Sequence, residues 1–183
     1  MNGHSDIVAG AIIGRKDLVA KIKLKLDHLG GSLDPHACYL LHRGMKTLAV
    51  RVRYQNESAL KIAKFLHDDE HVRKVNYAGL EDHPQHQRAL ELFDGFGGML
   101  SFELNGDMTA AERFIKKTRL PIVAPSLGGV ETLLTLPART SHAGMLPKER
   151  EELGITDGLI RMSVGIENTD DIIQDFEQAL RIS

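Results

Sequence analysis

The fold of this chain is decided by a short stretch near its C-terminal end in which polar and apolar residues alternate, Leu159-Ile160-Arg161-Met162-Ser163-Val164. Alternation with a period of two is typical of a half-buried strand, because successive side chains point to opposite faces. It predicts a strand over 159–166 with Arg161 and Ser163 on one face. The stretch 98–104 alternates in the same way and predicts a second strand.

Outward from these two strands, elements of both kinds alternate along the chain. Alternation over 72–77 and a short apolar run over 121–124 predict further strands. Helical spacing and capping residues predict helices over 82–92, 109–117 and 147–153, and a last one that begins at Asn168 or Thr169. Because the strands follow one another too closely for every connection to be a parallel crossover, we expect an α/β (α+β) unit with a mostly antiparallel sheet.

The first 70 residues have a different character. An apolar run over 7–13 predicts a buried strand, and two helices are expected over 16–29 and from Asp34-Pro35 to Gly44. A long amphipathic helix is expected over 45–67. We therefore divide the chain into 1–70 and 71–183. A lone strand at 7–13 cannot satisfy its own backbone groups, so either it pairs with something outside this chain or it is not a strand.

Composition narrows the class of protein. The chain has 183 residues, of which 42% are hydrophobic and 26% charged, and a formal net charge of -2. That balance argues against nucleic-acid binding, and no apolar run approaches the roughly 20 residues of a membrane span. A single cysteine excludes an internal disulfide framework. We expect a soluble intracellular protein that acts on small molecules or on other proteins.

Two features predict an anion site. Arg161 lies in an otherwise apolar strand, where a guanidinium needs an anionic partner. It could clamp a substrate carboxylate, form a structural ion pair with Glu131 or Glu167, or face solvent. The stretch that begins at Ser126 and contains Gly128-Gly129 could hold a carboxylate or phosphate, or be a plain glycine turn.

Other reactive side chains carry weaker signals. Ser141-His142 could suggest a nucleophile and base, but adjacent residues seldom face each other, so turn residues near a pocket are the better interpretation. The pair His83 and His86 flanks a proline and lacks a nearby carboxylate set, so no metal site is expected. Cys38 lies on an apolar helical face and is interpreted as a packing residue.

The sequence also resembles the Cys/Met-metabolism family of pyridoxal-phosphate (PLP) enzymes over nearly all of its length. The motifs that carry the resemblance are, in chain order, Asn2-Gly3-His4-Ser5-Asp6, Gly30-Gly31, Asp34-Pro35-His36-Ala37, Arg43-Gly44-Met45-Lys46-Thr47-Leu48, Tyr77-Ala78-Gly79-Leu80, His83-Pro84-Gln85-His86, Ser126-Leu127-Gly128-Gly129-Val130-Glu131, Ser141-His142-Ala143, and 159–167. Within the family the resemblance is strongest to the cystathionine gamma-synthase and gamma-lyase branches. Pro125 before Ser126 favours the synthase branch.

The resemblance implies a fold, a cofactor and a site. The fold would be type I of the PLP-dependent transferases, with 1–70 as a remnant of the PLP-binding domain and 71–183 as the substrate-side domain. Arg161 would hold the α-carboxylate of the amino-acid substrate, with Ser126 beside that carboxylate and Ser141 near the pocket. The enzyme would belong to methionine and cysteine metabolism, act as a homotetramer, and lie in the cytoplasm, or in the plastid of a plant.

The motif places the lysine that holds PLP two residues before Met1, so we expect this chain to be a C-terminal fragment without catalytic or certain cofactor-binding residues of its own. Whether the chain alone is an enzyme is therefore left open, and alone it is expected to bind no PLP covalently. Two functions remain. It is either the C-terminal portion of a gamma-replacement or gamma-elimination enzyme, or a noncatalytic interaction or regulatory subunit derived from this family.

Overall fold

The computed structural model describes residues 1–181, which divide into two compact units. The first unit is Met1–Leu48 and the second begins at Ala49. The contacts divide the chain there because the helix over Leu48–Asp68 packs into the core of the second unit. The predicted division of the parent enzyme near residue 70 stays a prediction.

The first unit contains two helices at the predicted places. Helix α1 is Lys16–Leu29 and ends at Gly30, whose φ of +76° is the left-handed conformation that glycine adopts readily. Helix α2 is Pro35–Met45, and the Asp34 carboxylate caps it by accepting the N–H of Ala37 at 3.0 Å. None of the α1 residues is buried.

Two expectations for the first unit are wrong. Residues 7–13 form no strand, and Cys38 is exposed rather than packed. Between residues 1 and 48 the structure has helices but no strand, so an extended segment finds no ladder of backbone partners there. Apolar character alone therefore did not suffice to make a strand.

The second unit is a five-stranded sheet with helices. Helix α3, Leu48–Asp68, precedes the sheet, whose strand order is β1-β2-β5-β4-β3. The pairing is antiparallel except between β3 and β4, which confirms the predicted mostly antiparallel sheet. The other elements are β1 Val72–Asn76, α4 His86–Leu92, β2 Met99–Leu104, α5 Met108–Lys117, β3 Ile122–Val123, β4 Leu133–Thr135, a 3-10 turn Pro137–Arg139, α6 Pro147–Glu152, β5 Leu159–Ser163 and α7 Thr169–Leu180.

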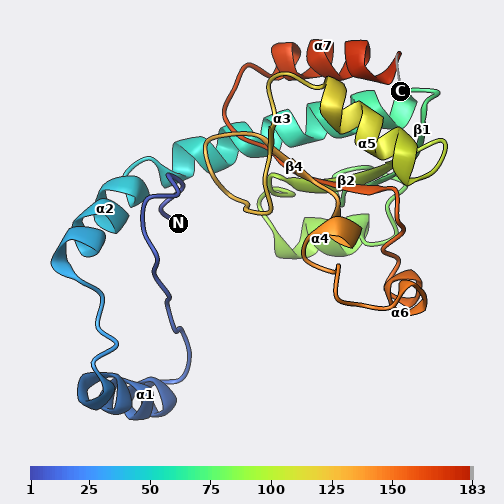
Figure 1. The fold of residues 1–183 in the computed structure, drawn as a ribbon. Coiled ribbons are helices and arrows are strands. Elements are labelled where there is room, and N and C mark those ends of the chain that lie inside the picture. Colours follow the sequence, from blue (N-terminus) through green and yellow to red (C-terminus); the bar gives the residue numbers. More distant parts are fainter. Residues whose placement is uncertain (182–183) are drawn as a thin grey trace. The chain divides into compact units, whose positions relative to one another are not determined.

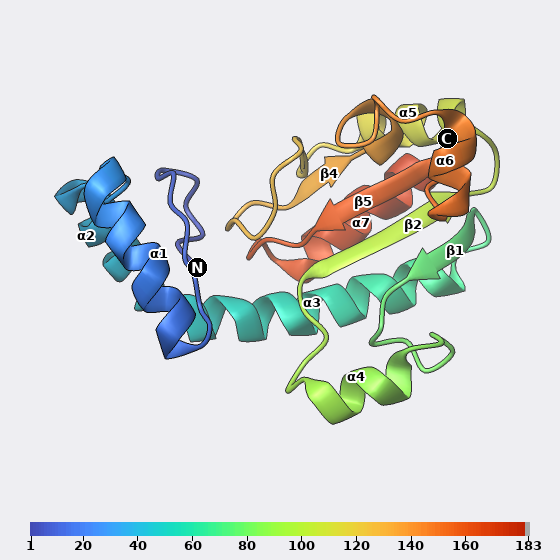
Figure 2. The ribbon, with the colours of Figure 1, turned by 90° about the horizontal axis from the view of Figure 1, so that it is seen from below.

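The core of this unit lies between one face of the sheet and a layer formed by α3, α5 and α7 (Figure 1). Three aromatic rings at its centre, Phe102 on β2, Phe114 on α5 and Phe176 on α7, are fully buried and contact one another. Figure 2 shows the opposite face of the sheet, where β2 and β5 run side by side in front of α7. Ile160 and Met162 of β5 point into the core, so Arg161 and Ser163 point to the opposite face of the sheet.

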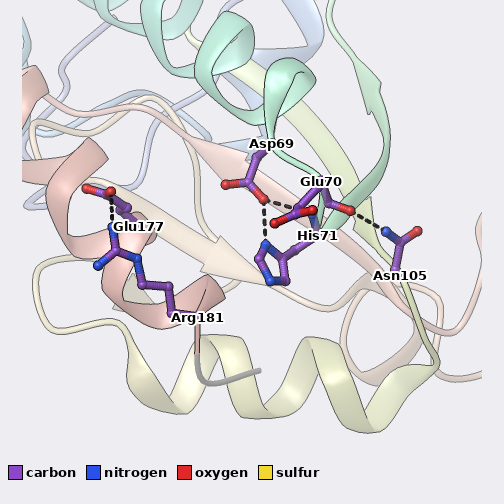
Figure 3. A network of polar contacts seen from close by, with 6 residues as sticks. All are labelled: Asp69, Glu70, His71, Asn105, Glu177 and Arg181. Carbon is purple, nitrogen blue, oxygen red and sulfur yellow. Dashed lines mark hydrogen bonds and ion pairs between the residues drawn. The ribbon is translucent and has the colours of Figure 1, made fainter.

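Polar contacts fix the turn from α3 into β1 (Figure 3). The Asp69 carboxylate accepts the backbone N–H of His71 at 2.8 Å and contacts its ring Nδ1 at 2.9 Å. Asn105, beyond the end of β2, donates its side-chain amide to the Glu70 carbonyl at 2.6 Å. The short connection is therefore held at both the helix end and the neighbouring strand, which sets the register of β1 against β2.

Several details of the second unit differ from the sequence prediction; for example, β5 ends at Ser163 rather than at residue 166. Strand β4 was not predicted, because three residues are too few to display a period. Helix α4 begins at His86 rather than at residue 82, since residues 80–86 close successive turns through the N–H groups of His83 and His86. No helix among residues 1–181 is both long and apolar enough to cross a membrane.

The phenol of Tyr77 gives a test of this packing. Burial raises the pKa of Tyr77 to about 12, whereas an unfolded tyrosine has a pKa of about 10. Since the folded state keeps the proton that the unfolded state releases, the free energy of unfolding should fall as the pH rises from 10 to 12. Near-ultraviolet absorbance should show a late-titrating tyrosine that is missing in Tyr77→Phe. Complete ionisation of all three tyrosines around pH 10 would show that the ring is not buried.

Candidate functional site

Arg161 lies on β5, the central strand, on the face of the sheet opposite the core. It stands opposite Ser101 of β2 and Thr135 of β4, and Ser101 in turn stands opposite Asn76 of β1. Residues in register share a face, so these four side chains form a polar row across the sheet. The Asn76 amide donates to the Ser101 hydroxyl at 3.2 Å. These polar residues from neighbouring strands therefore lie on one face of the sheet.

The guanidinium of Arg161 points toward the loop with the paired glycines. Its Nη2 donates to the backbone carbonyls of Pro125 and Ser126, at 2.6 and 2.9 Å. Nε is buried without a hydrogen-bond partner among the described residues, and Nη1 also lacks a partner there but is not buried. The carbonyls fix the direction of the side chain and leave its positive charge uncompensated.

This geometry argues against two of the alternatives for Arg161, an internal ion pair and a side chain in open solvent. Within residues 1–181 no carboxylate forms an ion pair with it. The Glu167 carboxylate, one predicted partner, instead accepts the backbone N–H and the hydroxyl of Thr132 at 2.6 and 2.7 Å. Arg161 is only half exposed and is turned to the glycine loop rather than to open solvent. It is thus a positioned cation with accessible hydrogen-bond capacity, which suits a carboxylate.

The loop over 125–130 is held along its whole length. Gly128 has a φ of +72°, a conformation that favours glycine, and its N–H donates to the hydroxyl of buried Ser163 at 2.9 Å. The side chain of Gln55, from α3, donates to the Gly129 carbonyl at 2.8 Å. The Ile166 N–H donates to the Val130 carbonyl at 2.8 Å. The paired glycines therefore lie in a held loop whose first two residues, Pro125 and Ser126, present their carbonyls to Arg161.

The two predicted serines lie in different surroundings. Ser126 is in the loop that contacts Arg161, through its backbone carbonyl, while its side chain is exposed. Ser141 is exposed and its hydroxyl contacts Nδ1 of His142 at 2.8 Å. Thr140, just before it, contacts Thr135 of the polar row at 3.0 Å. The roles of both serines in substrate binding stay predictions.

The histidines have ordinary structural partners. His86 contacts the Ala78 carbonyl through Nδ1 at 2.8 Å and stacks on Phe96, with ring centroids 5.4 Å apart. The Nδ1 of His83 accepts the N–H of Gln85 at 3.1 Å. Searching residues 1–181 finds no cluster of three His, Cys, Asp or Glu side chains that could hold a metal ion.

Sequence reasoning missed two supports of the loop. One is Gln55, and the other is the contact between Glu167 and Thr132, which joins the loop's far end to the segment after β5. Gln55 carries a signal that could have found it, because it lies three residues after Val52 and four before Ala59, on the apolar side of α3. A polar side chain at such a position is buried and needs a partner.

The chain is similar in sequence to known proteins over nearly its whole length. The sequence model of the family described as "Cys/Met metabolism PLP-dependent enzyme" matches residues 1–181. The chain is 43% identical over 180 residues to the chloroplastic cystathionine gamma-synthase 1 of Nicotiana tabacum, covering 98% of this chain and 33% of the relative. It is 42% identical over 182 residues to the cystathionine gamma-lyase of Mus musculus, covering 99% and 46%.

A solved structure is similar to the chain as a whole. The cystathionine gamma synthase from Xanthomonas oryzae pv. oryzae, in complex with aminoacrylate and cysteine, superposes with a TM-score of 0.93 at 39% identity. The match covers 98% of this chain and 47% of the solved chain. The present chain therefore spans between a third and just under half of the length of these relatives.

Proposed function

This chain belongs to the Cys/Met metabolism PLP-dependent enzyme family, and on that premise we propose that it forms the substrate side of a trans-sulfuration enzyme of the cystathionine gamma-synthase type. The proposed reaction is gamma-replacement on an activated homoserine, or gamma-elimination from a sulfur amino acid. Relatives of both the synthase and the lyase kind support the class of substrate, and Pro125 favours the synthase.

The proposal rests on one observation, the set of partners that the Arg161 guanidinium has in the structure. Its guanidinium is aimed by two backbone carbonyls and has no acidic partner among residues 1–181. Leaving a half-buried positive charge unpaired is unfavourable unless an anion arrives. The α-carboxylate of an amino acid matches the forked donors in charge and in shape. Arg161 would thus bind and orient the substrate, with Ser126 beside the carboxylate and Ser141 at the edge of the pocket.

We assign the amino-acid carboxylate, rather than the cofactor, to the described residues. When bound, PLP supplies the electron sink for this class of reaction. Within residues 1–181, no lysine amine forms a hydrogen bond with Arg161 or with the loop over 125–130. We therefore propose that this chain's part in the reaction is to bind and orient the carboxylate. We assign the binding of PLP to none of its described residues.

The proposal is tested by removing the charge from the ligand. The enzyme that carries this sequence, loaded with PLP, should bind L-cysteine about tenfold to a hundredfold more tightly than L-cysteinamide, because a hydrogen bond to a charged group contributes about 1.5 to 3 kcal/mol. Competitive inhibition of turnover measures both constants. Equal inhibition by the acid and the amide would contradict a carboxylate site at Arg161.

Two further properties implied by the family stay predictions. One is assembly as a homotetramer, which the exposed apolar residues Leu18, Leu24 and Leu29 of α1 support, since unburied apolar faces often mark contact surfaces. The other is a location in the cytoplasm or, in a plant, the plastid. The relatives from Nicotiana tabacum and Arabidopsis thaliana are chloroplastic by name.

A further inference from the structure

Gln55 is one of three polar residues, with Arg51 and Ser58, on the buried side of α3. Its side chain is only 8% exposed, although its neighbours along that side of α3 include Ala59 and Ile62. The helix passes close to the start of β2 here. A Cβ placed on Gly98 would lie 3.2 Å from the Cβ of Gln55, so the absence of a side chain at Gly98 leaves room for the glutamine.

The glutamine reaches the glycine loop from the helix layer. Its Nε2 donates to the Gly129 carbonyl at 2.8 Å, across 74 residues of sequence. Two other supports of the same loop, Arg161 and Ser163, come from β5. Because glycines restrict the backbone little, the conformation of 125–130 depends on such contacts rather than on local sterics. Gln55 thus connects this loop to the helix layer.

We infer that Gln55 is a positioning residue for the substrate carboxylate, acting through the loop on Arg161, an inference that rests on the proposed function. The carbonyls that aim Arg161 belong to Pro125 and Ser126, a few residues from the Gly129 carbonyl that Gln55 holds. Releasing Gly129 would let both carbonyls shift, and the guanidinium would lose its fixed direction. Small displacements of a positioning group have large effects on binding and rate.

The test compares two substitutions of the same kind. Gln55→Met keeps the length and volume of the side chain and removes the donor. Gln178→Met is the matched control, because the Gln178 amide also donates to a backbone carbonyl, that of Lys117 at 2.8 Å, but on α7 and away from the loop. In the PLP-loaded enzyme, Gln55→Met should raise KM for the amino-acid substrate about tenfold and change kcat by less than about threefold. Gln178→Met should leave both within about twofold.

A second readout does not depend on turnover. In the 183-residue chain, Gln55→Met should increase hydrogen exchange at the N–H of Gly128 and shift the Nε–H signal of Arg161 in NMR spectra, whereas Gln178→Met should do neither. Thermal unfolding of both variants shows whether each is folded. If Gln55→Met does not fold, Gln55→Glu, which keeps the shape but cannot donate when ionised, replaces it in both measurements.

A double variant that combines Gln55→Met with Arg161→Lys distinguishes the positioning role of Gln55 from the proposed function of Arg161. If Gln55 acts through Arg161, Gln55→Met should raise KM much less in the Arg161→Lys background than in the native enzyme. An equal rise in both backgrounds, or a KM for Gln55→Met no higher than for Gln178→Met, overturns the positioning role alone. If Arg161→Lys and Arg161→Ala leave KM unchanged, the proposed function itself fails.

Discussion

Replacement of Arg161 by alanine should weaken amino-acid binding by the enzyme about 30-fold to several thousandfold. The range follows from the roughly 2 to 5 kcal/mol lost when one partner of a desolvated charge pair is removed. Arg161 has its Nε buried and its Nη2 fixed by two carbonyls, so little of the charge would be replaced by water or a neighbouring side chain. Steady-state kinetics with the amino-acid substrate should show the loss mainly in KM.

Two further variants serve as controls for the Arg161→Ala result. Arg161→Lys keeps the charge but replaces the planar fork by a single ammonium, so its KM should lie between those of the native enzyme and the alanine variant. Arg139→Ala removes an exposed arginine that pairs with Glu112, and its KM should stay within about twofold of the native value. A native KM and kcat for Arg161→Ala would remove this residue from the site.

Replacement of Phe114 by alanine should lower the free energy of unfolding by about 3 to 5 kcal/mol. The ring is fully buried, with its centroid 5.6 Å from that of Phe102 and 5.2 Å from that of Phe176. It joins α5 to both the sheet and α7, so its removal leaves a cavity at the meeting point of three elements. Thermal unfolding followed by circular dichroism should show a midpoint lower by roughly 10 °C or more.

Phe93 gives the matched control for this substitution. It follows α4 and its side chain is 63% exposed, so Phe93→Ala should change the free energy of unfolding by no more than about 0.5 kcal/mol. Phe114→Leu fills much of the space and should cost less than Phe114→Ala. Equal stabilities of Phe114→Ala and Phe93→Ala would mean that the sheet, α5 and α7 do not share one core.

Much of the secondary structure could be predicted from local patterns. Helix α1 lies at its predicted residues because apolar spacing, an acidic first turn and Gly30 all agree. The predicted strands of the second unit are present for the same reason, since each shows a period of two or a bounded apolar run. The run over 7–13 shows the limit, because a strand needs a neighbour and the first unit has no strand to pair with it.

The site was predictable only in part. That Arg161 sits on a strand, beside a glycine loop, followed from residue types and from the family resemblance. That the loop presents carbonyls to the guanidinium, and that Glu167 binds Thr132 rather than Arg161, did not follow. An acid and a base in one sequence can pair in many ways, and hydrogen-bond geometry selects among them.

The sequence by itself determined which residues face the same way, since that depends on the helix and strand periods of nearby residues. The alternating pattern places Arg161 and Ser163 on one face of the sheet. The N-cap residues Asp34 and Asn168 mark where α2 and α7 begin. Only the tertiary structure decided what lies opposite each face, because contacts such as that between Gln55 and Gly129 join segments 74 residues apart. Such contacts depend on closing long loops and on packing one particular core, and no local pattern contains that information.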